Sequence, residues 1–182
     1  MLYRSSILTL SLASFIACQS KQDTPPPPPT GDAAAQAQQV VQEAATGVVQ
    51  RYEYIPAQNL VKAYWDPANT WGNQELLSKH INTAIQFASR IFNRDSTIQT
   101  IDFITSIPKD SNSTERVKAL EDVIDRGKFR SIHWKDLSQK PVVAPYMRTV
   151  TTHWVLPSIQ SDIETKPIDR DILFQQFDTI TP

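Results

Sequence analysis

The sequence has little cysteine and little glycine. Its 182 residues include one cysteine, Cys18, and four glycines. A single cysteine forms no disulfide within the chain, so the fold must rest on a hydrophobic core. Scarce glycine disfavours a turn-rich β-sandwich and favours a fold that contains long helices. The formal net charge of −1 gives no reason to expect a nucleic-acid partner.

Recognisable catalytic and metal-binding patterns are also missing. The three histidines, His80, His133 and His153, are not spaced as a metal-binding pair, and no second cysteine supports them. The sequence shows no phosphate-binding glycine loop and no ordered Ser/His/Asp set. We therefore expect no metal, no cofactor and no catalytic residues.

The N-terminus has the layout of an export signal. A basic start ending at Arg4 precedes an apolar run from Ile7 to Ile16, followed by the small residue Ala17 and then Cys18. The run is shorter than the ~20 apolar residues that span a bilayer. This pattern predicts a signal peptide at residues 1–17.

Phe15-Ile16-Ala17-Cys18 resembles the lipobox of bacterial lipoproteins, with Phe15 where leucine is usual. The resemblance implies cleavage before Cys18, acylation of Cys18 by chains such as palmitate, and attachment to a membrane. Gln19, rather than an aspartate, follows the cysteine, which in these families favours an outer-membrane lipoprotein facing the periplasm. The alternatives are an ordinary signal peptide with a chance cysteine, or a membrane-buried N-terminal helix.

Composition divides the remaining chain into a linker and one domain. Residues 18–46 are rich in Pro, Ala and Gln, and Pro25 to Pro29 form a run expected to adopt polyproline II. We interpret residues 18–46 as a lipid-anchored linker with a short helix near residues 36–45. Residues 47–182 are expected to form a single domain.

Hydrophobic periodicity predicts the fold class. Residues 74–92 carry apolar side chains at three- and four-residue intervals, which predicts a long amphipathic helix. The prediction is a small two-layer α+β domain with an antiparallel sheet packed on this helix. The other expected elements are strands at residues 59–65, 97–107 and 146–156, a strand rather than a helix at 115–125, a short helix after Asp125, and a helix at 169–177.

Charges of both signs are interleaved between residues 115 and 135. We expect a mixed-charge, solvated face there. If the acidic residues segregate to one side, the other side becomes a basic docking surface for anionic lipid, glycan or an acidic partner.

Trp65 and Trp71 flank a loop-like stretch and are the predicted partner-binding residues. Tryptophan is enriched at binding hot spots, and loops place it on the surface. In the alternative, one or both rings fold back over the end of the long helix.

These observations favour a non-enzymatic role. The expected function is that of a structural or adaptor component of a cell-envelope assembly, with a protein partner in the envelope. The alternative is a periplasmic inhibitor or immunity protein that neutralises a toxin or hydrolase. A third hypothesis is a hydrolase that uses His133 or His153.

Overall fold

The computed structural model describes residues 31–67, 72–110, 113–137 and 143–165. These residues form an α+β domain built on a five-stranded sheet in the order β1-β2-β3-β4-β5. The predicted fold class is therefore confirmed. The strands are β1 (Arg51–Ile55), β2 (Leu60–Trp65), β3 (Thr100–Pro108), β4 (Arg116–Asp125) and β5 (Val150–Val155).

The sheet is antiparallel except at one central pair. β2 and β3 run parallel, whereas β1 with β2, β3 with β4, and β4 with β5 are antiparallel. The parallel pair follows from the crossover through helix α2 (Asn73–Phe92), which returns the chain to the same end of the sheet. Residues 115–125 form a strand, as predicted, because β4 pairs with β3 along its length.

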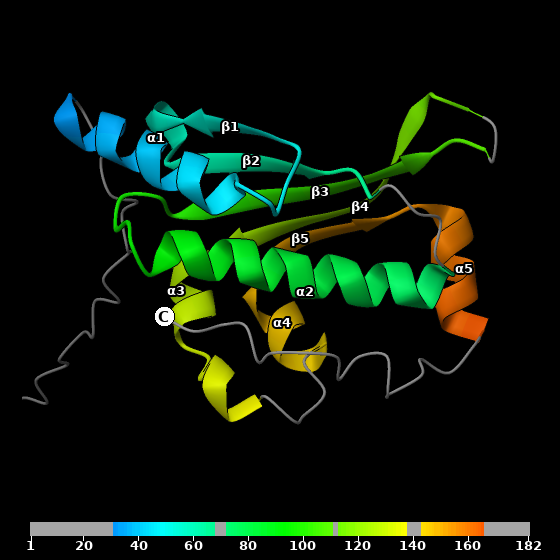
Figure 1. The fold of residues 1–182 in the computed structure, drawn as a ribbon. Coiled ribbons are helices and arrows are strands. Elements are labelled where there is room, and N and C mark those ends of the chain that lie inside the picture. The colour runs from blue at the N-terminus through cyan, green and yellow to red at the C-terminus, as the bar shows by residue number, and fades with distance from the viewer. Residues whose placement is uncertain (1–30, 68–71, 111–112, 138–142, 166–182) are drawn as a thin grey trace, which may run out of the picture.

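The helices cover one face of the sheet (Figure 1). α2 is the longest helix and lies across β3 and β4, while α1 (Asp32–Ala45) contacts α2 and β1. The shorter helices are α3 (Arg126–Arg130), α4 (Val143–Thr149) and α5 (Pro157–Thr165), with 3-10 turns η1 (Pro56–Gln58) and η2 (Trp134–Leu137). The fully buried side chains of α2 that form its inward stripe are Ile81, Ala84, Ile85, Phe87, Ala88, Ile91 and Phe92.

α1 belongs to the folded domain rather than to a linker. Ala37, Val41 and Ala44 on this helix are buried in the main core. We expected the domain to begin at residue 47, but α1 lies before that boundary and contributes side chains to the core. Alanine, glutamine and glutamate favour helix locally, but packing against α2 fixes the element.

Two segments differ from the predicted secondary structure. Residues 146–156 are divided between the end of α4 and strand β5, because Tyr146 and Thr149 lie three residues apart on the buried face of a helix. Strand β1 and helix α5 were not predicted. The helix expected at residues 169–177 lies outside the described residues. No helix in the described ranges has both the length and the hydrophobicity needed to cross a membrane.

Candidate functional site

Asp122 is the centre of a buried polar cluster beneath the helices. It lies on β4 between Leu120 and Ile124, which face the core, and its residue exposure is 0%. The strand's alternation therefore places a carboxylate where an apolar side chain is expected. A buried charge at such a position needs partners.

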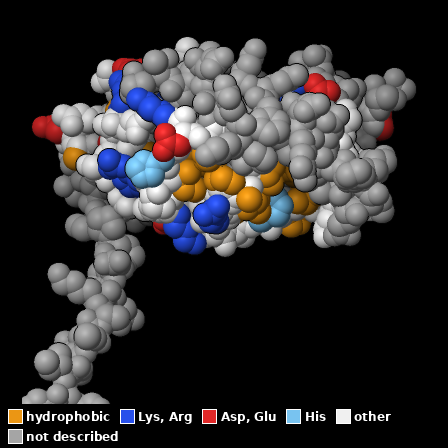
Figure 2. Space-filling model, turned by 90° about the horizontal axis from the view of Figure 1, so that it is seen from below, with side chains coloured by type: hydrophobic (Ala, Val, Ile, Leu, Met, Phe, Trp, Pro, Cys, Tyr) orange, Lys and Arg blue, Asp and Glu red, His pale blue; other side chains and the backbone are white. Residues whose placement is uncertain are grey.

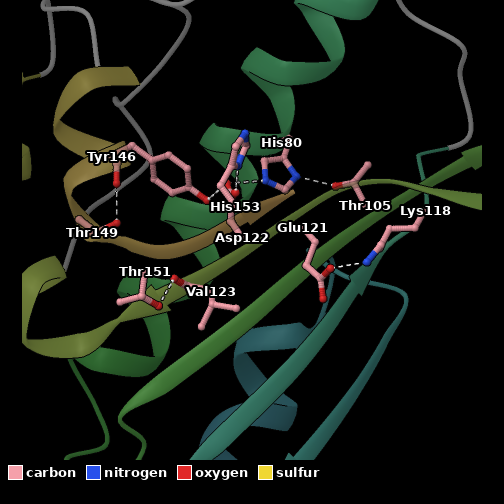
Figure 3. A network of polar contacts seen from close by, with 10 residues as sticks. All are labelled: His80, Thr105, Lys118, Glu121, Asp122, Val123, Tyr146, Thr149, Thr151 and His153. Carbon is pink, nitrogen blue, oxygen red and sulfur yellow. Dashed lines mark hydrogen bonds and ion pairs between the residues drawn. The ribbon is translucent and has the colours of Figure 1, made fainter. Parts of the chain in front are cut away.

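Three donors from three different elements surround this carboxylate (Figure 3). His80 Nε2 on α2 is 2.9 Å from Asp122 Oδ2, and the Tyr146 hydroxyl on α4 donates to the same oxygen at 2.7 Å. His153 Nδ1 on β5 donates to Oδ1. Both carboxylate oxygens are thus used inside the fold.

The other side of His80 is also bonded. Because a carboxylate only accepts, His80 donates to Asp122 through Nε2, and its Nδ1 is 2.7 Å from Thr105 Oγ1 on β3. The His80 ring also packs edge-on against Phe103, with ring centroids 5.3 Å apart. The cluster therefore ties α2, α4 and β5 to the centre of the sheet.

The hydrogen bonds shift the proton affinities in the cluster. Burial opposes ionisation of Asp122, but hydrogen bonds from His153, His80 and Tyr146 outweigh it and hold the pKa of this carboxyl well below its usual range. Burial and the Asp122 charge raise the pKa of Tyr146, which stays a neutral donor. The hydrogen bond to Asp122 raises the pKa of His153, against the opposing effect of partial burial.

His153 is the only member of this cluster that reaches solvent. Its side chain is 32% exposed, whereas that of Asp122 is 1% exposed. Asp122 fixes Nδ1 as the donor, so a neutral His153 presents its Nε2 lone pair outward, and Nε2 has no partner among the described residues. A histidine held in this way is able to accept and return a proton.

A second polar group lies on the opposite face of the sheet. Lys62 Nζ is 4.0 Å from Asp102 Oδ2, and Lys118 pairs with Glu121 while lying 4.5 Å above the Trp154 ring. Burial, and then the charge of Glu121, raises the pKa of Asp102. These residues form mixed-charge pairs in which Asp102 is buried and Lys118 is exposed.

The predicted site residues lie apart from this cluster. Trp65 is 8% exposed and belongs to the main core. Its partner-binding role stays a prediction. Trp71 and Cys18 lie outside the described residues.

Sequence reasoning did not bring Asp122, His80 and Tyr146 together. The available signal was an aspartate on the apolar face of a predicted strand, together with a histidine one residue before Ile81 on the helix stripe. Either placement implies a buried partner. The identity of that partner depends on the pairing of distant elements.

Comparison with known proteins gives no relatives. No protein-family model, no curated protein and no solved structure matches this chain. Among the described residues, no group of three or more His, Cys, Asp or Glu side chains is placed so that it could hold a metal ion. The functional argument therefore rests on the chain itself.

Proposed function

We propose that this protein is a membrane-anchored lipoprotein that faces the periplasm from the outer membrane and acts as a non-enzymatic structural or adaptor component of a cell-envelope assembly. The observation that carries the proposal is Cys18 at the end of a lipobox-like signal, followed by a run of five prolines at residues 25–29. Two or more acyl chains anchor a protein stably, and a stiff proline-rich spacer holds a domain away from the bilayer.

The folded domain supports binding rather than chemistry as its main role. Both oxygens of Asp122 are engaged by internal donors, and the resulting bonds join helices to the sheet. A fully satisfied buried network of this kind makes the packing of a domain specific. A rigid domain on a tether suits an adaptor that presents a fixed surface to a partner.

Purification from detergent-solubilised membranes tests this proposal. A stoichiometric multiprotein complex is the expected result. Recovery with one tightly bound enzyme would instead indicate the inhibitor or immunity role, and recovery of the protein alone would contradict the adaptor role.

A second candidate function is favoured by His153 alone. Its imidazole is oriented by Asp122 and partly exposed, whereas His133 has no hydrogen-bonded side-chain partner among the described residues. A hydrolase would use His153 Nε2 to take a proton from an attacking water. Its activity would be lost in His153→Gln and retained in His133→Gln, and equal activity in both variants would exclude this candidate.

A further inference from the structure

The basic residues of the domain are not distributed evenly. Between residues 126 and 148 the sequence has six basic residues and one acidic residue, Asp136, although the whole chain has a net charge of −1. Five of these basic residues, Arg126, Lys128, Arg130, Lys135 and Arg148, belong to α3, η2 and α4, whereas Lys140 lies outside the described residues. The three elements lie together below α2 in the view of Figure 1, and α3 contacts α4. We call the outward side of these three elements the basic surface.

The exposed cations of the basic surface differ from the others in having no partner. Lys128, Arg130, Lys135 and Arg148 are exposed, and none pairs with a carboxylate or carbonyl in the described part of the chain. Every other described lysine and arginine has such a partner. Among the acidic residues near this stretch in sequence, Glu121 pairs with Lys118, Asp122 is buried, and Asp125 caps α3 by accepting from the Lys128 backbone N–H. Asp136 on η2 is exposed and is the one carboxylate of the described residues between 126 and 148.

Partly buried apolar side chains accompany these cations. Trp134 stacks on Phe129, with ring centroids 4.7 Å apart, and donates its indole N–H to the Phe129 carbonyl. Leu137 on η2 and Met147 on α4 are also only partly buried. Figure 2, seen from below the view of Figure 1, shows hydrophobic side chains grouped together with Lys and Arg beside them and few acidic side chains.

We propose that the basic surface docks on an anionic lipid bilayer. Lysine and arginine are attracted to anionic headgroups, while partly exposed tryptophan and aliphatic side chains enter the headgroup region. Charge complementarity favours an anionic occupant, and the apolar side chains among the cations favour a bilayer over a purely polar polyanion. The proposal rests in part on the proposed function, because acylated Cys18 would keep the domain beside a membrane.

Cosedimentation with lipid vesicles tests the docking without the acyl anchor. The chain from residue 18 onward, with Cys18→Ser, is mixed with phosphatidylcholine vesicles or with vesicles containing equal phosphatidylcholine and phosphatidylglycerol. We expect binding to the anionic vesicles only, and weaker binding as salt increases. The proposal would be overturned if the protein did not bind the anionic vesicles. It would also be overturned if the protein bound the polyanion polyglutamate but not the anionic vesicles.

Charge variants locate the contact. Each cation contributes roughly fivefold to partitioning, so the double variant Lys135→Gln/Arg148→Gln should bind more than tenfold more weakly. The matched control is Arg51→Gln/Lys109→Gln, which removes the same charge from other surfaces. If both double variants lost vesicle binding equally, the effect would come from net charge rather than from the basic surface, and the proposal would be overturned.

A second pair of variants covers the case in which the first fails to fold. Lys128→Gln/Arg130→Gln changes two exposed side chains of α3 and should show the same loss of anionic-vesicle binding, with thermal unfolding confirming an intact domain. Unchanged binding in this folded variant would contradict the proposal. A negative result in the vesicle assay would not bear on the acylation of Cys18, because the assay uses the Cys18→Ser chain. The docking and the anchor are therefore tested separately.

Discussion

Asp122 Oδ2 lies 2.9 Å from His80 Nε2, although the two residues are 42 positions apart in the sequence. This contact joins the longest helix to the fourth strand of the sheet within a buried environment. Tyr146 donates to the same oxygen and adds α4 to the junction. One carboxylate therefore links α2 and α4 to the sheet.

Replacing this carboxylate should destabilise the fold strongly. Asp122→Ala leaves buried donors of His80 and Tyr146 without an acceptor, which should lower the free energy of unfolding by roughly 3–5 kcal/mol. Urea denaturation measures the change. Glu53→Ala, at an exposed position on β1, is the control and should change stability by no more than about 0.5 kcal/mol. A loss at Asp122 no larger than in the control would show that the cluster is not structural.

The sequence predicts the position of this cluster only in part. The alternation of Leu120, Asp122 and Ile124 places the aspartate inside the sheet, so burial of a charge follows from the pattern. Its donors come from α2, α4 and β5, and no local pattern reports which distant elements meet. The parallel pairing of β2 with β3 does have a local signal, because the predicted strand, helix and strand at residues 59–65, 74–92 and 97–107 form a crossover that joins parallel strands.

The long helix and the strands next to it were predictable because their periods are clear. Residues 100–108 alternate with a period of two, whereas the apolar residues of α2 recur every three or four positions. Residues 143–149 have β-branched and aromatic side chains that suit a strand, but Tyr146 and Thr149 turn inward together on a helix. Pro145 lies in the first turn of that helix, where its missing N–H breaks no bond.

Stability should depend on the protonation of His153. Its hydrogen bond to Asp122 raises the pKa of His153 in the folded state above that of the unfolded chain. The stabilisation is therefore complete below about pH 6.5 and is lost as the pH rises through the folded-state pKa. Urea unfolding between about pH 6 and 9 should show a decline in stability that is flatter in His153→Gln.

The matched control for this pH effect is His133→Gln. His133 is exposed and bonds no carboxylate in the described residues, so its replacement should preserve the parental decline. Identical pH profiles for the parent and His153→Gln would show that the contact with Asp122 does not couple proton binding to folding.

Trp65 distinguishes a core role from a binding role. Its side chain belongs to the main core, so Trp65→Ala should cost about 3–5 kcal/mol of stability, measured by thermal or urea unfolding. Full stability combined with loss of an envelope partner during co-purification would instead assign Trp65 to an interface.

Attachment through Cys18 is the central claim, and metabolic labelling with radioactive palmitate tests it most directly. The parent chain should carry the label and fractionate with the outer membrane, because acylation precedes stable anchoring. Cys18→Ala should lack the label and accumulate unprocessed or in the soluble fraction. Label that persists in Cys18→Ala, or a parent chain without label, would contradict the account.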